Sequence, residues 1–162
     1  MTRLFVAVWP PGDVVEMLER LPRYPLAGAR WTTRPQWHVT LRYLGAADVG
    51  VATEALEGLE ANRCTAVLGP RARPINPSVL VVSVGGLDDL AMAVERAMPG
   101  IGPPARYPYR GHLTLARAGN GALPRLDVDV VAQWQVDQVA LVESHLHPAG
   151  ATYDTLHVRS LA

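Results

Sequence analysis

Two short segments of the chain share one pattern, in which a histidine, an apolar residue, a threonine and a leucine follow one another. The segments are His38-Val39-Thr40-Leu41 and His112-Leu113-Thr114-Leu115. On a β-strand, side chains two residues apart share a face at a spacing of roughly 7 Å. If both segments are strands, each presents an imidazole beside a hydroxyl. Such a set can hold a phosphate and transfer protons on both sides of it.

The repetition carries more weight than either copy. A single His-x-Thr pattern in a strand is weak, because most such histidines are structural or merely exposed. Here two of the five histidines have the same apolar-Thr-Leu continuation. The pair therefore favours one site built around His38 and His112.

In-line displacement at phosphorus needs groups on opposite faces of the phosphate, which is a reason to have two segments. One histidine would protonate the leaving oxygen while the other deprotonates water, and a pKa near 6.5 suits both roles. Thr40 and Thr114 would hydrogen-bond the non-bridging oxygens. By strand alternation Arg42 shares the face of the first histidine, where it would assist the phosphate or line the mouth of the cleft. Alternation places Arg117 on the face opposite His112, which argues against a role.

Composition narrows the chemistry further. The 162 residues form one domain, 1–162, and the formal net charge is zero, so no global field favours a nucleic acid or a membrane. No lysine occurs, which excludes ligases that use a lysyl-adenylate and also Schiff-base enzymes. Cys64 is the only cysteine, so a disulfide within the chain and a thiolate metal cluster are excluded.

Charged residues are unevenly distributed around the repeated segments. Residues 20–47 and 96–126 contain no Asp or Glu, whereas each window contains five arginines. Depletion of acids in strands accounts for part of this pattern. The arginine surplus is what a phosphate-bearing substrate requires.

Strands and helices alternate irregularly in the predicted order of elements. We expect strands at residues 4–8, 37–44, 64–68, 79–84, 112–116, 135–142 and 152–158, and helices at 13–21, 49–61 and 88–98. Residues 29–33 are expected to be extended, residues 70–77 to form a proline-rich connection and residues 100–108 to form a loop. Asp13 with Glu16 predicts a capping box at the first helix. Without a glycine-rich loop between a strand and a helix, this order favours an α+β fold over a doubly wound one.

Aromatic and metal-binding candidates are few. Alternation sends Trp37 and Tyr43 into the core and leaves Trp31, Tyr107 and Tyr109 as candidates for stacking on bases, although burial is the simpler expectation for each. The pair His145-x-His147 lacks enough neighbouring ligands for a tight metal site, so none is expected.

Together these motifs resemble the two-histidine (2H) phosphoesterase superfamily, and within it the RNA 2′,3′-cyclic phosphodiesterase family, also called 2′-5′ RNA ligases. The resemblance includes Arg3-Leu-Phe-Val-Ala-Val8, and Glu143-Ser-His-Leu146 followed by Gly150 and Tyr153. It covers essentially the whole chain. Gly111 stands where many members have proline, and we expect it to loosen the approach to the second histidine.

The resemblance implies two pseudo-symmetric lobes of antiparallel sheet, with helices outside and a central cleft between the motif strands. It implies His38 as proton donor and His112 as proton acceptor, with Thr40, Thr114 and Arg42 binding substrate and neither metal nor cofactor. Tyr153 would approach the cleft in an unassigned role. On the residues alone the roles of the two histidines are interchangeable.

The expected activity is hydrolysis of RNA 2′,3′-cyclic phosphate ends to 2′-phosphomonoesters. Reverse ligation of such ends to 5′-hydroxyls is left open. Two alternatives remain: a phosphodiesterase for small cyclic or 2′-5′ nucleotides, and a nucleotide- or RNA-binding module without turnover. RNA ends are the expected partner, with no membrane and no obligate protein partner. No apolar run approaches the roughly 20 residues that cross a bilayer, and we expect a cytoplasmic protein.

Overall fold

The computed structural model describes residues 1–25, 27–105, 108–119 and 122–162. Over these residues the chain forms nine strands, three α-helices and one short 3₁₀-helix. In chain order the elements are β1 (Thr2–Val8), α1 (Gly12–Glu19), β2 (Ala29–Trp31), η1 (Arg34–Gln36), β3 (Val39–Ala47), α2 (Val49–Glu57), β4 (Cys64–Asn76), β5 (Val79–Gly85), α3 (Asp88–Ala97), β6 (His112–Ala118), β7 (Ala132–Val136), β8 (Gln138–His147) and β9 (Gly150–Ser160).

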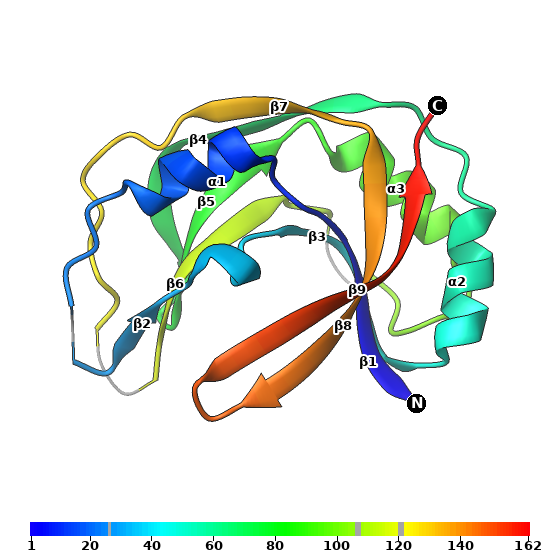
Figure 1. Cartoon of the computed structure of the whole chain (residues 1–162), viewed down its shortest axis with the longest axis horizontal. Coiled ribbons are helices and arrows are strands. Elements are labelled where there is room, and N and C mark those ends of the chain that lie inside the picture. The colour runs from blue at the N-terminus through cyan, green and yellow to red at the C-terminus, as the bar shows by residue number, and fades with distance from the viewer. Residues whose placement is uncertain (26, 106–107, 120–121) are drawn as a thin grey trace.

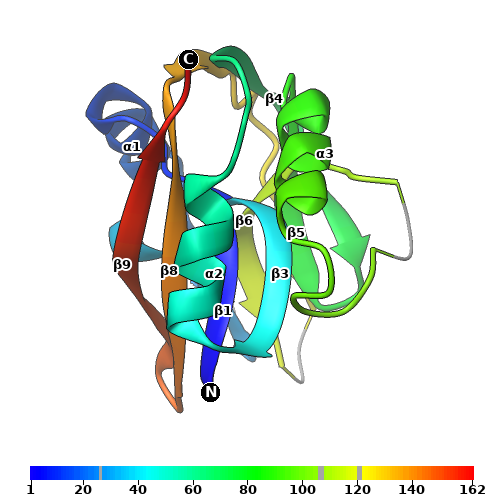
Figure 2. The ribbon, with the colours of Figure 1, turned by 90° about the vertical axis from the view of Figure 1, so that its right-hand side faces the viewer.

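All nine strands belong to one antiparallel sheet with the order β7-β4-β5-β6-β3-β1-β8-β9, and β2 pairs with β6 beside this path. The sheet curls, and α2 and α3 lie next to each other outside it (Figures 1 and 2). The α+β prediction is confirmed. The two expected lobes are the halves of this sheet, which meet where β3 and β6 pair through Val39 and Leu113.

Alternation along β1 divides the interior into two clusters. Leu4, Val6 and Val8 pack in the main core, between the sheet and the helices. Phe5 and Ala7 point to the other face, where they join a small cluster with Ala140 and Val142. We call this second side the inner face of the sheet. Because β1 is covered on both faces, its sequence from Leu4 to Val8 is continuously apolar rather than alternating.

Two helix ends differ from the prediction. Pro11 caps α1 without a side-chain bond, so the predicted capping box of Asp13 and Glu16 is wrong. Proline already has the φ that the cap needs, −73°, and its carbonyl accepts the first helical bond, from Val15, at 3.0 Å. Helix α2 ends at Glu57 rather than at residue 61, and Gly58 follows it.

The proline-rich stretch 70–77 is largely strand rather than connection, because β4 runs from Cys64 to Asn76. β7 pairs only with the first part of β4, up to Leu68, whereas β5 pairs as far as Asn76. Beyond Leu68 this edge of β4 has no β7 partner, although the Pro70 carbonyl still accepts a bond from Val130. Proline is tolerated at such an edge because its missing N–H is not needed there.

The apolar stretch 135–142 is divided between two strands. β7 ends at Val136 and pairs with β4, while β8 begins at Gln138 and pairs with β1 and β9. One intervening residue, Asp137, therefore links the first strand of the order to the last but one, which requires the sheet to curl into a half-barrel. No helix among the described residues combines the length and apolarity that a membrane span needs.

Candidate active site

The two repeated segments lie side by side. His38 immediately precedes β3, and His112 begins β6. Because Val39 pairs with Leu113 in antiparallel register, His38 lies across from Thr114, and Thr40 lies across from His112. All four side chains thus face the inner side of the sheet, with a local two-fold relation between the segments.

The imidazole of His38 is packed among aromatic rings. Its centroid lies 4.8 Å from that of Phe5, 5.6 Å from that of Trp9 and 5.0 Å from that of Tyr153. The pKa of His38 is lowered to about 4, mainly by burial, with the main-chain hydrogen bond to Gln36 opposing the shift and Arg117 and His112 adding to it. The ring is therefore neutral in the free protein near neutral pH.

Hydrogen bonds fix the tautomer of both histidines. Nδ1 of His38 lies 2.8 Å from the main-chain oxygen of Gln36, and Nδ1 of His112 lies 2.9 Å from that of Arg110. A carbonyl can only accept, so both Nδ1 atoms carry hydrogen. In the neutral ring Nε2 is then the free base, and Nε2 of His38 lies 3.1 Å from the Thr40 hydroxyl. Each ring presents its Nε2 for proton transfer.

Gly111 does not loosen the approach to His112, contrary to expectation. Its carbonyl accepts a 2.9 Å hydrogen bond from Val84 of β5. A Cβ at this position would lie 2.4 Å from the Val84 carbonyl oxygen. Glycine is present because β5 passes too close to accommodate a side chain.

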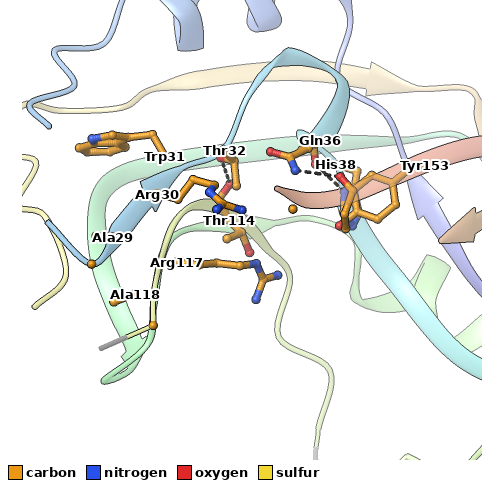
Figure 3. Close-up of a pocket in the computed structure, with 14 residues that line it drawn as sticks. Ala29, Arg30, Trp31, Thr32, Gln36, His38, Thr114, Arg117, Ala118 and Tyr153 are labelled. Atoms are coloured by element: carbon orange, nitrogen blue, oxygen red, sulfur yellow. Dashed lines mark hydrogen bonds between the residues drawn. The ribbon is translucent and has the colours of Figure 1, made fainter. Parts of the chain in front are cut away.

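A cavity of about 560 Å³ opens beside His38 (Figure 3). His38, Thr114, Arg117 and Tyr153 line it together with η1 and β2. Neither His112 nor Thr40 belongs to the lining. The cavity therefore lies to the His38 side of the paired segments.

Arg117 lies in this cavity, so the prediction from alternation was wrong. Thr114 pairs with Val81 and Ala116 pairs with Leu80, which makes Leu115 an extra residue, a β-bulge. Leu115 and Ala116 are therefore both buried in the main core, and Arg117 returns to the inner face.

Arg42 points away from the site, and the alternation argument was wrong here too. In the pairing of β3 with β1, Leu41 is the extra residue, so Arg42 pairs with Val6 and shares its helix-facing side. Its Nη2 donates to main-chain oxygens of Ile101 and Pro103, at 3.2 and 3.3 Å. Its Nη1 lies 4.0 Å from a carboxylate oxygen of Glu95 on α3.

Comparisons with known proteins identify the family. No family model matches the chain. The RNA 2′,3′-cyclic phosphodiesterase of Aeropyrum pernix is 33% identical over 141 residues, which cover 75% of this chain and 80% of that protein. This chain belongs to the RNA 2′,3′-cyclic phosphodiesterase (2′-5′ RNA ligase) family.

Solved structures agree in fold. The protein TT0787 of Thermus thermophilus has a TM-score of 0.76 and 28% identity, covering 98% of this chain and 97% of its own. E. coli LigT complexed with 3′-AMP has a TM-score of 0.77 and 20% identity, covering 99% and 98%. The protein is thus a phosphodiesterase with the LigT-like fold.

The aromatic candidates of the phosphodiesterase have different locations. Trp37 is buried in the main core as expected, but Tyr43 is 45% exposed because the Leu41 bulge turns it to the inner face, where it pairs with Phe5. Trp31 lines the cavity, and the Tyr109 hydroxyl donates to the Thr40 carbonyl at 2.8 Å. Burial raises the pKa of Tyr109. Tyr107 lies outside the described residues.

His145 has two carboxylate neighbours. Its Nε2 lies 3.1 Å from Asp154 on β9 and 3.5 Å from Glu143 on its own strand. The sequence could not reveal Asp154 as a neighbour, since β9 brings it across the hairpin. Glu143 pairs with Leu4 of the main core, so this trio lies on the face opposite Tyr153 and the paired histidines. His147 instead lies near Thr152.

Sequence reasoning missed three residues around His38. Phe5 and Trp9 pack against its ring, and Gln36 lines the cavity and donates to the Ala151 carbonyl at 2.9 Å. The spacing Thr33-x-x-Gln36 is a capping-box signature, and it is the signal by which the sequence could have indicated η1. Phe5 and Trp9 carried no such signal, because they lie within and directly after an apolar strand, β1.

Proposed function

We propose that this phosphodiesterase hydrolyses 2′,3′-cyclic phosphates at RNA ends to 2′-phosphomonoesters, without a metal ion. The observation that carries the proposal is the antiparallel pairing at Val39 and Leu113, which places two histidines and two threonines around one point. The name of the Aeropyrum pernix relative supports the substrate. The cytoplasmic location expected from the sequence is part of this proposal.

In the proposed reaction, Nε2 of His112 accepts a proton from water as its oxygen attacks phosphorus. The bond from phosphorus to the 3′ oxygen breaks, and Nε2 of His38 donates a proton to that oxygen. The hydroxyls of Thr40 and Thr114 and the guanidinium of Arg117 hold the non-bridging oxygens. Hydrolysis leaves a 2′-phosphate and a 3′-hydroxyl.

Protonation of His38 must accompany substrate binding, because its pKa is about 4 in the free protein. Arg117 and His112 contribute to that low value. A phosphodiester anion bound beside Arg117 offsets the guanidinium charge and favours the imidazolium of His38. The Gln36 carbonyl accepts from Nδ1 in both charge states, so it holds the ring in place throughout.

The cavity provides a place for the terminal nucleoside. The leaving oxygen belongs to that nucleoside, so the nucleoside must lie on the side of the proton donor. The cavity lies on the His38 side, and Trp31 and Tyr153 supply aromatic surface in its wall. Stacking of this kind suits unpaired RNA ends.

The test is incubation of the protein with a short RNA that ends in a 2′,3′-cyclic phosphate, followed by identification of the terminus. We expect a 2′-phosphate. Unchanged RNA alongside turnover of small cyclic or 2′-5′ nucleotides would replace the RNA assignment, and binding without any turnover would indicate a binding module. Addition of an RNA with a 5′-hydroxyl tests ligation, in which that hydroxyl replaces water as the nucleophile, the bond from phosphorus to the 3′ oxygen breaks and a 2′-5′ linkage forms.

A further inference from the structure

Thr32, just after β2, is the one polar residue that is buried among the described residues, at 8% exposure. Its hydroxyl donates to the carbonyl oxygens of Thr114 and Leu115, at 2.8 and 2.9 Å. Its backbone N–H donates to Leu115 as well, at 2.8 Å. The indole N–H of Trp37 donates to the same hydroxyl oxygen at 2.9 Å. The side chain thus binds the main chain of β6 at two consecutive residues, of which Thr114 is drawn in Figure 3.

These two residues are the start of the β6 bulge. A bulge interrupts the ladder and leaves main-chain groups without partners on the neighbouring strand. Such buried groups need other partners. On the side of β6 opposite β5, β3 pairs at Leu113 and β2 pairs from Ala116 onward, so the carbonyls of Thr114 and Leu115 lie between two partner strands, where Thr32 bonds them.

The bulge determines which way Arg117 points. Regular alternation after Thr114 would place Arg117 on the face of Leu113, which is fully buried in the core. The extra residue, Leu115, reverses this and brings the guanidinium into the cavity with His38 and Thr114.

We infer that Thr32 is a positioning residue, which clamps the β6 bulge and so holds Arg117 at the phosphate site. The inference rests on the proposed phosphate-binding role of Arg117. Thr32 touches no reacting atom in this scheme and acts through the main chain of Thr114 and Leu115.

The test compares Thr32→Val, which keeps the shape and removes the hydroxyl, with Thr32→Ser, which keeps the hydroxyl. We expect Thr32→Val to lower kcat/KM on cyclic-phosphate RNA by roughly 10- to 100-fold, the same range that we expect for Arg117→Ala, and Thr32→Ser to retain most of it. The double variant of Thr32→Val with Arg117→Ala should be no worse than Arg117→Ala alone. Thr65→Val, an exposed threonine on β4, is the matched control and should be unchanged.

Two readouts do not depend on turnover. Inorganic phosphate should bind more weakly to Thr32→Val, and the pKa of His38 measured by NMR should rise, because Arg117 no longer holds its charge nearby. Full additivity with Arg117→Ala, or unchanged phosphate affinity and His38 titration, would overturn the inference. If RNA is not a substrate but these readouts change, the proposed function fails and the clamp stands.

If Thr32→Val does not fold, Thr32→Cys replaces it, because a thiol is a weaker hydrogen-bond donor than a hydroxyl. Phosphate affinity and kcat/KM should then fall from threonine to serine to cysteine. Equal values for Thr32→Ser and Thr32→Cys would overturn the clamp.

Discussion

Burial of His38 among Phe5, Trp9 and Tyr153 makes its charged form costly, and this has consequences for both catalysis and stability. An imidazole that is neutral in the free protein acts as an acid only after the substrate has changed its surroundings. The Nδ1 atoms of the two histidines have matched partners, the main-chain oxygens of Gln36 and Arg110, so the Nδ1 bonds do not distinguish the roles of the two rings.

The first prediction concerns stability against pH. The pKa of His38 is about 4 when folded and 6.5 as a free side chain. Below pH 6.5 the unfolded chain therefore binds more protons than the folded protein. The contribution of neutral His38 to the unfolding free energy is fully present above that pH and is lost as the pH falls towards 4. Between about pH 7 and about pH 4 the loss from this group is about 3 kcal/mol of unfolding free energy. Urea titrations of wild type and His38→Gln should differ by this amount in pH dependence; parallel curves would refute the low pKa.

The second prediction separates hydroxyl chemistry from packing at Thr40 and Thr114. Serine at either position keeps the donor and should retain most activity, whereas valine keeps the shape and should lose on the order of 10²-fold or more. Steady-state rates on a cyclic-phosphate RNA measure this. If serine and valine cost the same, the threonines do not hold the phosphate oxygens.

The third prediction assigns the two histidines. Alanine at His38 or His112 should cost roughly 10²- to 10⁴-fold on cyclic-phosphate RNA. A nitrophenyl phosphodiester has a leaving group that hardly needs a proton, so His38→Ala should regain much of its rate there and His112→Ala should not. The reverse pattern would exchange the roles, and equal impairment on both substrates would remove the acid–base assignment.

At the scale of the element, close packing between strands decides what each active-site strand can contain. β5 approaches the start of β6 so closely that position 111 has no room for Cβ. The bulges at Leu41 and Leu115 then turn two arginines in opposite senses, Arg42 away from the site and Arg117 into it.

The fourth prediction tests this packing with a matched pair of glycines. Gly111→Ala places Cβ 2.4 Å from the Val84 carbonyl oxygen, so β5 and β6 must separate beside His112. We expect a loss of about 1–3 kcal/mol in unfolding free energy, typical of overpacking, and lower kcat. Gly12→Ala meets no atom within 4 Å at the start of α1 and should be neutral or mildly stabilising. Chemical denaturation compares the two, and similar effects would contradict the close approach.

At the scale of the molecule, the curled sheet keeps the proposed chemistry and the acidic cluster apart. The paired histidines face the inner side, whereas Glu143, His145 and Asp154 lie within reach of a common cation on the other face. Any ion bound there is therefore remote from the reacting groups.

The fifth prediction is that hydrolysis persists in EDTA, because protein side chains supply every group in the proposed reaction. Rates on cyclic-phosphate RNA with and without EDTA measure this. Asp154→Asn serves as the control, since it weakens the cluster on the other face and should leave the rate unchanged. Loss of activity in EDTA with recovery on adding a divalent ion would refute the metal-free mechanism.

The amino-acid sequence by itself determined the paired His-x-Thr segments, the α+β class and most strand positions. These features depend on neighbours in the chain: alternation, apolar runs and the residues that end them. The same local reasoning identified His38, His112, Thr40 and Thr114 as candidates, and the antiparallel register brings these four together.

Only the tertiary structure decided which arginine enters the site and which histidine is buried. A bulge depends on the partner strand and on distant groups, as the bond from Thr32 to Leu115 shows across 83 residues of chain. Simple alternation continued past such a bulge predicts the wrong face of the sheet. For this reason the sequence placed Arg42 in the site and Arg117 outside it, whereas the structure shows the reverse. Burial of His38 likewise depends on Tyr153 of β9, more than a hundred residues away, and desolvation is a property of the folded surroundings rather than of the residue.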